Sequence, residues 1–346
     1  MMNKYSRNPV ISIDQIVPSR PDYEVIGAFN AGVAKYKGKV ILLLRVAERP
    51  VHNISGIHLA PVYDYVRDKI MNMEFKTTDI NYDFSDPRII KGIKCQTYLT
   101  SISHIRLAVS DDGYHFNIAE HPVISASDEY SAFGVEDPRI TQMGEEYYIN
   151  FSVVSVNGVA TRLVRTQDFN KYHDMGIIFY PDNKDVAIFP QKINGKYYAL
   201  HRPAASELCR PQMWIAQSDD LRFWGNHVQL AKVRDGSWDS SRIGAGAVPI
   251  LTKWGWLEIY HGADNNNRYC LGAMLLDKDN PTKVLRRSIN PLVEPTEPYE
   301  CHGFFGNVIF SCGLLQDGNN LHIYYGASDE SIARLDTTID YVLSNM

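Results

Sequence analysis

The sequence lacks several features that would assign it to a membrane or a secreted class. No apolar run approaches the about 18 residues that span a bilayer, and the first residues, MMNKYSRNPVISID, lack the apolar core of a secretory signal. Cysteine is scarce and scattered, with no CxxC pair: Cys95, Cys209, Cys270, Cys301 and Cys312. This pattern favours free thiols in a reducing compartment and disfavours zinc. We therefore expect a soluble, cytoplasmic protein without a metal.

The sequence also lacks the signals of polyanion and nucleotide binding. The formal net charge is -5, and no basic block or basic tail appears. Nucleic acid and anionic membrane are therefore not expected partners. A glycine-rich phosphate loop of the nucleotide type is absent, so ATP chemistry is unsupported. What the sequence does contain is tyrosine, 21 residues of 346, which suits half-buried strands and surfaces that stack on ring-shaped ligands.

Short strand patterns recur along the chain as similar units. A unit has an apolar strand, a turn at Gly, Asn or Lys, a Tyr-rich strand and a third strand that ends in a Ser-Asp or Asp-Asp turn, as in PQKINGKYYALHRP followed by MWIAQSDDLRFWG. Equivalent prolines are 52 positions apart from Pro138 to Pro190 and 59 apart from Pro190 to Pro249. Periods of about 50 residues with four strands each are typical of propeller blades. The five clear units predict an all-β, five-bladed β-propeller.

Two other architectures are compatible with the pattern. Residues 86–116 could form a sixth blade, since Asp137 lies 51 positions after Asp86, and a β-sandwich is the second alternative. We favour five blades in a single catalytic domain over residues 1–346. Residues 51–98 are then an elaboration of the first blade, with a short helix expected around Val66 to Met73.

In a propeller the first strands of all blades line a central channel, so residues at their ends converge. Reading only these positions gives a mixture of carboxylates and cations: Asn30, Arg45, Glu136, Asp137, Arg139, Lys184, Asp185, His201, Arg202, Tyr260, His261 and Asp329. A carboxylic acid beside a sugar can protonate a departing glycosidic oxygen, and clustered cations suit inorganic phosphate. An acid with a phosphate site predicts phosphorolysis, whereas two carboxylates flanking a water predict inverting hydrolysis. A glycan-binding propeller without catalysis is the third hypothesis.

The dipeptide Asp-Pro followed by Arg occurs twice, at Asp86 and within the stretch FGVEDPRIT at Asp137. Asp before Pro is common in turns, because Pro holds the preceding residue in extended geometry. We expect at most one copy to carry chemistry, and we interpret Asp86 as a structural copy. His261 could likewise be a hydrogen-bonded core histidine.

Four motifs in order, FGVEDPRIT, ALHRP, GWLEIYHG and YYGASD, resemble glycoside hydrolase family 130, and the likeness extends over nearly the whole chain. The resemblance implies a five-bladed propeller. The stretches YECHGFFGNVIFSCG, DFSDPRIIKG and TYLTSISHIRLAVS are most similar to the branch that acts on β-1,2-linked mannose. This implies reversible, inverting conversion of β-1,2-mannobiose, or short β-1,2-mannooligosaccharides, and phosphate to α-mannose 1-phosphate and mannose. Inorganic phosphate is then a cosubstrate, and neither a metal nor an organic cofactor is required.

The resemblance also implies roles for single residues. Asp137 matches the general acid, whose proton passes through the 3-hydroxyl of the mannosyl unit. The expected sugar contacts are Asn30, Arg45, Glu136, Phe304 and Asp329. The expected phosphate contacts are Lys184, Arg202 and His261.

One departure from the family pattern keeps a hydrolase open as an alternative. Many members have a phosphate-binding Lys directly after Pro-Ile, whereas here Leu251 follows and Lys253 lies two positions on. A hydrolase, a β-1,2- or β-1,4-mannosidase, would need a second carboxylate, for which Glu136 is the candidate. A homodimer is also plausible from the Tyr- and Trp-rich strands.

Overall fold

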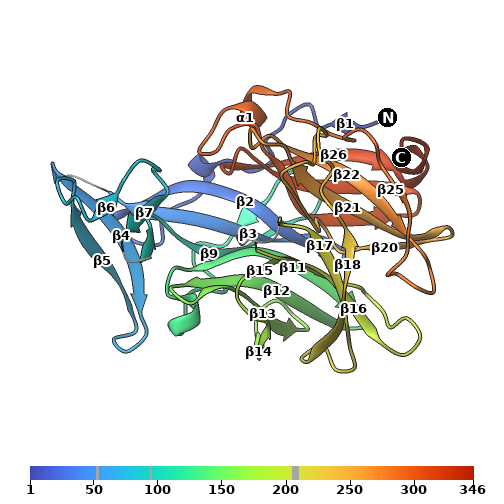
Figure 1. The fold of residues 1–346 in the computed structure, drawn as a ribbon, viewed down its shortest axis with the longest axis horizontal. Helices are drawn as coiled ribbons and strands as arrows, with labels where there is room; N and C mark the ends of the chain where they lie inside the picture. Colours follow the sequence, from blue (N-terminus) through green and yellow to red (C-terminus); the bar gives the residue numbers. More distant parts are fainter. Residues whose placement is uncertain (52–53, 94–95, 205–209) are drawn as a thin grey trace.

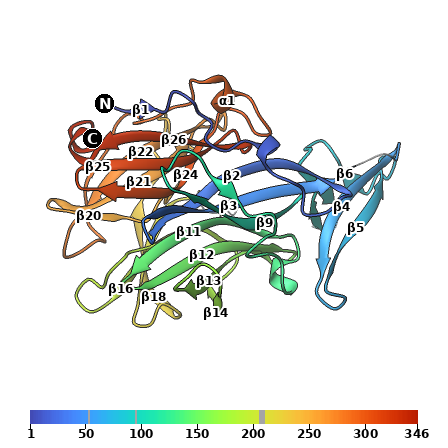
Figure 2. The same ribbon diagram turned by 180° about the vertical axis from the view of Figure 1, so that it is seen from behind.

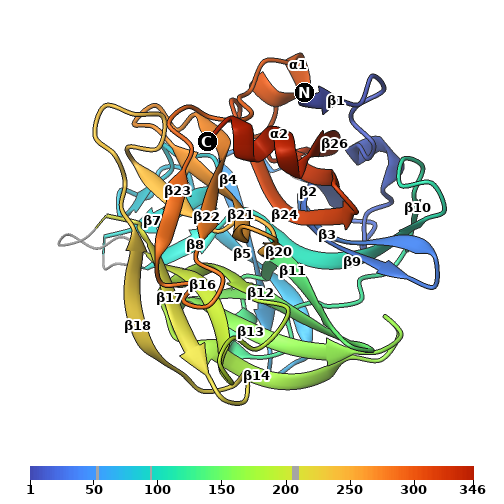
Figure 3. The ribbon, with the colours of Figure 1, turned by 90° about the vertical axis from the view of Figure 1, so that its right-hand side faces the viewer.

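The computed structural model describes the whole chain except residues 52–53, 94–95 and 205–209. Five antiparallel sheets of similar construction follow one another along the chain, and in Figure 3 they are arranged around a common centre. We number them blades I to V in chain order. The predicted five-bladed β-propeller is confirmed, and the six-bladed and sandwich alternatives are wrong.

The blades are built from the following strands. Blade I contains β2 (Tyr23–Tyr36), β3 (Lys39–Pro50), β9 (Ile102–Ser110) and β10 (Asn117–Ile118). Blade II contains β11 (Val135–Met143), β12 (Glu146–Ser155), β13 (Gly158–Thr166) and β14 (His173–Phe179). Blade III contains β15 (Asn183–Ile188), β16 (Tyr197–Pro203), β17 (Met213–Ser218) and β18 (Trp224–Ala231). Blade IV contains β19 (Arg242–Gly244), β20 (Ile250–Thr252), β21 (Gly255–Ala263), β22 (Tyr269–Leu276) and β23 (Val284–Arg287). Blade V contains β24 (Ile309–Asp317), β25 (Asn320–Ala327), β26 (Ser331–Thr338) and β1 (Asn3–Lys4).

Helices are few and short. The 3-10 helices are η1 (Ile13–Gln15) and η2 (Glu129–Ser131), and the α-helices are α1 (Pro298–Cys301) and α2 (Ile339–Ser344). Among the described residues, no helix has the length and apolar character needed to cross a bilayer.

The two ends of the chain meet in blade V. Strand β1 pairs antiparallel with β26, with Asn3 opposite Asp336 and Lys4 opposite Leu335. The N-terminal strand therefore forms the outer edge of the last blade, and Figures 1 and 2 show the termini close together. Hydrogen bonds between the first and last strands close the ring, so blade V cannot separate from blade I without breaking them.

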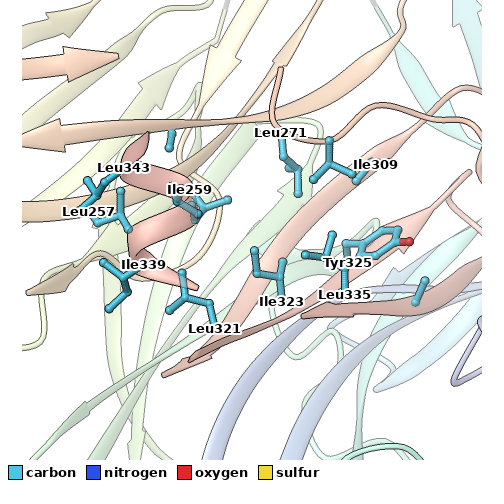
Figure 4. Packing of buried hydrophobic residues seen from close by; sticks show 14 of the residues in the cluster. Leu257, Ile259, Leu271, Ile309, Leu321, Ile323, Tyr325, Leu335, Ile339 and Leu343 are labelled. Atoms are coloured by element: carbon cyan, nitrogen blue, oxygen red, sulfur yellow. The ribbon is translucent and has the colours of Figure 1, made fainter. Parts of the chain in front are cut away.

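The hydrophobic core is divided into five main clusters, each lying between two neighbouring blades. Figure 4 shows the cluster between blades IV and V, capped by α2; its labelled residues are Leu257, Ile259, Leu271, Ile309, Leu321, Ile323, Tyr325, Leu335, Ile339 and Leu343. Equivalent clusters join V to I, III to IV, I to II and II to III. Each blade has apolar side chains on both faces, as the nearly continuous apolar strands predict. Burial of this surface holds the blades rigidly around the channel.

The turn at the end of the third strand repeats from blade to blade, as the sequence pattern predicts. In blade I, the hydroxyl of Ser110 accepts a hydrogen bond from the amide of Gly113, and Oδ1 of Asp112 accepts from the amide of His115. Thr166 with Asp168 and Ser218 with Asp220 repeat this arrangement in blades II and III. These side chains satisfy the amides that leave the sheet.

Residues 51–98 leave blade I after β3 and return at β9, forming a projection that Figures 1 and 2 show at one side of the molecule. It contains the hairpin β4 (Ile57–Asp64) and β5 (Lys69–Lys76), and the small sheet β6 (Tyr82–Asp83), β7 (Ile89–Gly92) and β8 (Thr97–Leu99). We call residues 51–98 the extension.

The short helix expected around Val66 to Met73 is wrong, because this segment is the turn and second strand of the β4–β5 hairpin. Oδ1 of Asp64 accepts hydrogen bonds from the amides of Val66 and Arg67, which closes the turn. Side chains along β5 then alternate in burial over most of its length. Cross-strand pairing therefore outweighs the helix propensity of Met, Glu and Lys.

Candidate active site

Residues from all five blades meet in one cavity of about 440 Å³. Its lining contains Asn30, Arg45, Arg88, Asp137, Lys184, Asp185, Arg202, Arg242, Asn267, Tyr269, Phe305, Val308, Phe310 and Asp329. The inner strands β2, β11, β15, β19 and β24 all contribute to this lining. Six of the nine predicted site residues lie here: Asn30, Arg45, Asp137, Lys184, Arg202 and Asp329.

Three inner strands carry the same distortion at the cavity. Asn30, Asp137 and Asp185 have positive φ values of 51°, 52° and 55°, and each lies where the strand register shifts by one residue. Asn and Asp tolerate the left-handed region better than other non-glycine residues. A bulge at such a position re-aims one side chain away from the regular alternation of the strand. The bulges therefore direct one Asn and two Asp side chains towards the cavity.

Asp137 is held by two donors from blade I. Its Oδ1 accepts a hydrogen bond from Nδ2 of Asn30 at 2.9 Å and another from Nη1 of Arg45 at 3.1 Å. The other nitrogens of Arg45 donate to Glu136 at 2.8 Å and to the hydroxyl of Ser103 at 3.1 Å. Arg45 also packs over the ring of Phe29 at 4.6 Å. The guanidinium is thereby fixed between two neighbouring carboxylates.

The two cavity carboxyls nearest Arg45 have opposite pKa shifts. Burial opposes ionisation of Asp137, but the charges of Arg45 and Lys184 and the hydrogen bond from Asn30 lower its pKa. Burial and the negative charges of Asp137 and Glu136 outweigh Arg45 at Asp329, and they raise the pKa of Asp329 to about 6. Within the described part of the chain no hydrogen bond reaches the Asp329 carboxyl. At neutral pH Asp137 is therefore ionised, and Asp329 holds a proton more readily than Asp137 does.

Two cations lie side by side on blade III. Lys184 on β15 is paired in register with Arg202 on β16. Nζ of Lys184 lies 3.5 Å from Oε2 of Glu136, and Nε of Arg202 donates to Oδ2 of Asp185 at 2.6 Å. Oδ1 of Asp185 is also 3.4 Å from Nη2 of the buried Arg139. Two guanidinium groups thus share one carboxylate, which leaves a net positive charge at this wall.

Arg139 links the acid to this wall without reaching the cavity. It donates to the carbonyls of Gly246 at 2.7 Å, Ala245 at 2.8 Å and Asp137 at 3.3 Å. The motif Glu-Asp-Pro-Arg therefore combines a cavity carboxylate with a buried arginine that ties β11 to blade IV. The buried His201 is similarly structural, since its ring nitrogens contact Asn183 at 3.0 Å and His227 at 3.1 Å.

The sequence analysis missed a cation on blade IV. Arg242 lines the cavity and donates to the hydroxyl of Tyr269 at 3.0 Å and to Oδ1 of Asn267 at 3.3 Å. Among the described residues, its side-chain partners are neutral and no carboxylate forms an ion pair with it, and its buried Nε has no hydrogen-bond partner. Its position at the start of an inner strand was the available signal, but the polar run SWDSS that precedes it is typical of a loop.

Three predicted site residues lie outside the lining. Glu136 is buried, between Arg45 and Lys184. His261 is fully buried behind the cavity, where Nε2 lies 3.3 Å from Asp185 and the ring packs on Phe310. Phe304 packs against the cluster between blades V and I, and its neighbour Phe305 lines the cavity instead. Direct phosphate contact from His261 and sugar contact from Phe304 are therefore unsupported by this geometry.

The earlier Asp-Pro-Arg copy places its arginine, but not its aspartate, at the cavity. Asp86 does accept two hydrogen bonds from the Arg88 side chain, at 3.0 and 2.8 Å, as a turn interpretation predicts. However, Arg88 itself lines the cavity. Asp185, which was expected near the channel but given no role, and Phe305 line the cavity too. The shared bulge in FNAG, EDPR and KDVA places Asp185 at the position equivalent to Asn30 and Asp137.

Leu251, at the position where many family members have a phosphate-binding Lys, lies away from the cavity. Leu251 pairs with Trp256 at the beginning of β21, whereas the strand that enters the cavity, β19, pairs with residues 261–263 at its other end. Leu251 lines a separate hollow with Trp256 and Lys278, and Lys253 packs on the ring of Trp254. No set of three or more His, Cys, Asp and Glu side chains is arranged for a metal ion anywhere in the described ranges.

Comparison with known proteins gives consistent matches. The sequence profile of glycoside hydrolase family 130, described as beta-1,4-mannooligosaccharide phosphorylase, matches residues 87–346. The chain is 50% identical to a beta-1,2-mannobiose phosphorylase of Listeria innocua over 99% of this chain and 98% of the other. It is 35% identical to a 1,2-beta-oligomannan phosphorylase of a Thermoanaerobacter species, over 84% of this chain and 92% of that one. A solved complex of the Listeria innocua enzyme with beta-1,2-mannobiose superposes with a TM-score of 0.97, covering 99% and 98% of the two chains.

Proposed function

The chain belongs to glycoside hydrolase family 130, and from this premise we propose that it catalyses reversible, inverting phosphorolysis of β-1,2-mannobiose. The products are α-mannose 1-phosphate and mannose. One observation carries the proposal: a carboxylate on a bulged inner strand, Asp137, shares one cavity with the cations Lys184, Arg202 and Arg242. The similarity to an enzyme solved with this disaccharide supports the choice of substrate.

The charges around the cavity suit a phosphate dianion. Arg202 and Arg139 share Asp185, and Arg242 has no ion-pair partner among the described residues. A dianion that bridges Arg202, Lys184 and Arg242 would satisfy this excess of positive charge through charge-assisted hydrogen bonds. We therefore assign these three side chains to phosphate binding.

Asp137 is the proposed general acid. A phosphate oxygen forms a bond to the anomeric carbon from the face opposite the departing oxygen, the glycosidic bond breaks, and the departing oxygen receives one proton. The family resemblance implies that this proton leaves Asp137 and passes through the 3-hydroxyl of the mannosyl unit. Asn30 and Arg45 orient the acid, and Asp329 accepts hydrogen bonds from sugar hydroxyls.

Hydrolysis is the less favoured alternative because Glu136, the carboxylate predicted to act as its base, is already paired. An inverting hydrolase needs a free carboxylate base beside a water on the face opposite the acid. Glu136, the candidate for that role, accepts a hydrogen bond from Arg45 at 2.8 Å and lies 3.5 Å from Lys184. It is not among the residues that line the cavity. The bulge that directs the Asp137 carboxylate into the cavity argues against a non-catalytic glycan-binding propeller.

The test is an assay of the purified protein with β-1,2-mannobiose, with and without inorganic phosphate, measuring mannose 1-phosphate directly. We expect the sugar phosphate only when phosphate is present. Free mannose in equal amounts in both reactions, without mannose 1-phosphate, would instead establish a hydrolase. If no product forms, the protein either binds glycans without catalysis or acts on a different linkage. An assay with β-1,4-linked mannobiose would distinguish these two possibilities.

Three further assignments complete the proposal. Residues 1–346 form one catalytic domain with the extension as an elaboration of blade I, because the extension leaves and rejoins this blade between paired strands. A cytoplasmic location is favoured by the free thiols of Cys270, Cys301 and Cys312; Cys95 and Cys209 lie outside the described residues.

A homodimer is favoured by exposed apolar side chains on the extension, such as Val66 and Ile80. Light scattering after size-exclusion chromatography would test the dimer.

A further inference from the structure

A separate cavity of about 320 Å³ lies between the β4–β5 hairpin of the extension and blade I. Its other walls come from the segment before β2, the end of β3, the beginning of β9 and the loop after β10. The hairpin is anchored over this cavity, because Nη1 of Arg20 donates to the carbonyl of Ile70 at 3.2 Å. The amide of Tyr63 also donates to the carbonyl of Ala132 at 2.8 Å. We call this cavity the hairpin pocket; among the described residues, none lines both it and the active-site cavity.

The inner wall of the hairpin pocket contains a buried donor without an acceptor. His104 lines the pocket and is 6% exposed. Nε of Arg106 donates to Nε2 of His104 at 2.9 Å, so Nε2 is the acceptor and Nδ1 carries the hydrogen of the neutral ring. Burial and the charge of Arg106 lower the pKa of His104 to about 3, which keeps the ring neutral. No described residue accepts a hydrogen bond from Nδ1, so a ligand that does so removes the cost of a buried, unsatisfied donor.

The charges around the hairpin pocket balance one another. The four charged lining residues comprise two cations and two carboxylates: Arg20, Lys69, Glu48 and Asp68. Glu48 is paired with the buried Arg106 at 3.0 Å. Arg20 forms a bidentate pair with Asp22, at 2.9 and 2.7 Å. The other two charged residues are exposed neighbours of opposite sign on the hairpin. An ionic ligand gains little from a wall whose charges are already compensated, so the pocket favours a neutral polar ligand.

The remaining lining suits a single sugar ring. Ile70 and Ile102 supply apolar side chains, and Ser125 supplies a hydroxyl. Tyr63 supplies an aromatic ring, whose hydroxyl donates to Oδ1 of Asp68 at 2.6 Å. A hexose matches this mixture, because it has hydroxyls around its edge and an apolar face that packs on an aromatic ring. The volume of about 320 Å³ is at the lower end of the about 300–1,000 Å³ of small-molecule sites, which favours a monosaccharide over a longer glycan.

We propose that the hairpin pocket binds one neutral hexose, and that free mannose is the hexose that occupies it. The choice of mannose rests on the proposed function, since phosphorolysis of β-1,2-mannobiose releases this sugar. A hydroxyl of the hexose accepts a hydrogen bond from Nδ1 of His104, and its apolar face packs on the ring of Tyr63. The bound sugar is a separate molecule from the substrate, because the two cavities have no lining residue in common. The protein therefore holds two sugars at once, one in each cavity.

The experiment is equilibrium dialysis of the unmodified protein against radiolabelled mannose, with and without an excess of unlabelled β-1,2-mannobiose. Phosphate is left out, so that the disaccharide competes for the active-site cavity without being phosphorolysed. We expect one labelled mannose per chain to remain bound in the presence of excess disaccharide. Complete displacement of the label would overturn the inference, because all bound mannose would then lie in the active-site cavity. Release of unlabelled mannose during dialysis would reveal hydrolysis, which contradicts the proposed function and not the pocket.

Two variants with matched controls locate the retained mannose. Ser125→Trp fills the pocket from an exposed position, and His121→Trp is its control, an exposed residue of the same loop that does not line the pocket. Tyr63→Ala removes the aromatic ring, and Tyr65→Ala is its control on the same hairpin, at a side chain that is 54% exposed. We expect both lining variants to weaken binding of the retained mannose by about tenfold or more, a loss of about one good contact. The controls should bind it as the unmodified protein does.

Circular dichroism checks that all four variants are folded. Unchanged retention of mannose in Ser125→Trp and Tyr63→Ala would overturn the inference, because the sugar would then bind elsewhere. The measurement needs no turnover, so it remains readable if the protein forms no mannose 1-phosphate. In that case the proposed function fails, while retention that depends on Ser125 and Tyr63 would still establish the hexose site.

Discussion

Nη1 of Arg45 donates a hydrogen bond to Oδ1 of Asp137 at 3.1 Å, and this contact favours the ionised form of the residue that must act as an acid. Lys184 adds to the effect, and together they lower the pKa of Asp137 despite its burial. A general acid must carry its proton when the reaction begins. The arrangement therefore requires something that raises the pKa of Asp137 once the substrates are bound.

Phosphate is the ligand that would raise the pKa of Asp137, because its negative charge compensates the positive charges of Lys184 and Arg202 beside the acid. We predict that phosphate binding is accompanied by proton uptake at Asp137, so that phosphate affinity falls as the pH rises. Isothermal titration of phosphate in two buffers of different ionisation enthalpy measures this uptake. Phosphate exchanges protons of its own, which Asp137→Asn controls for. Equal proton uptake by the two proteins would contradict the coupling.

Replacement of the acid should abolish turnover, whereas replacement in the other Asp-Pro-Arg copy should not. We predict that Asp137→Asn lowers kcat by about 10²- to 10⁴-fold, the usual contribution of a general acid. Asp86→Asn should keep kcat within a fewfold, because Asp86 contacts Arg88 and not the reacting atoms. Circular dichroism confirms folding of both variants. A loss of kcat of similar size in the two folded proteins would show that this distinction is wrong.

The unpaired Arg242 yields a prediction about phosphate. We predict that Arg242→Ala and Arg202→Ala each raise the KM for phosphate by about tenfold or more, since a charge-assisted hydrogen bond contributes about 1.5–3 kcal/mol. The KM for β-1,2-mannobiose should change much less. Arg268→Ala is a control on the same blade, because Arg268 pairs with Glu294 at the surface. If Arg242→Ala leaves the phosphate dependence unchanged, Arg242 does not bind phosphate.

The architecture could be predicted from the sequence because each blade repeats a local pattern. Turn chemistry at Ser110 and Asp112 recurs in later blades, and apolar strands recur at a spacing of about 50 residues. Candidate residues such as Asp137 and Arg202 were found because inner-strand ends converge in any propeller. The extension was predicted as a segment outside the repeat, but its internal structure was not, since its hairpin is formed by pairing of β4 with β5 and not by a repeated local pattern.

The differences between the predicted site residues and the residues that line the cavity also have physical causes. The position of a residue in the sequence predicts that it lies near the central channel, but not whether its side chain points into the channel. His261 pairs with Leu271 in the middle of blade IV and is fully buried, although its neighbours in sequence suggest a cavity residue. Phe304 and Phe305 are adjacent, yet one packs into the core and the other lines the cavity. Arg88 is brought to the cavity only by packing of the extension, which no local pattern encodes.

The opposite pKa shifts of Asp137 and Asp329 predict opposite effects on stability. The folded protein raises the pKa of Asp329 from 3.8 to about 6, so folding favours the protonated form. The stabilising contribution is fully present below about pH 4 and is lost as the pH rises through about 6. Asp329→Asn should therefore increase the free energy of unfolding at pH 7.5 by about 1–3 kcal/mol and have little effect at pH 4.

Asp137→Asn should do the reverse, because the lowered pKa of Asp137 means that its ionised form stabilises the fold above the pKa of the unfolded chain. This variant should lose stability at pH 7.5 and still at pH 4, and it should lose less only as the pH falls below 3.8, the ordinary pKa of an aspartate. Urea denaturation of both variants at pH 7.5 and 4, and of Asp137→Asn also below pH 3.8, measures these differences. Destabilisation of Asp329→Asn at pH 7.5 would mean that Asp329 is stabilised as a carboxylate by the site. If Asp329→Asn is instead more stable at pH 7.5 and loses turnover, the Asp329 carboxyl serves sugar binding although it lowers the stability of the fold.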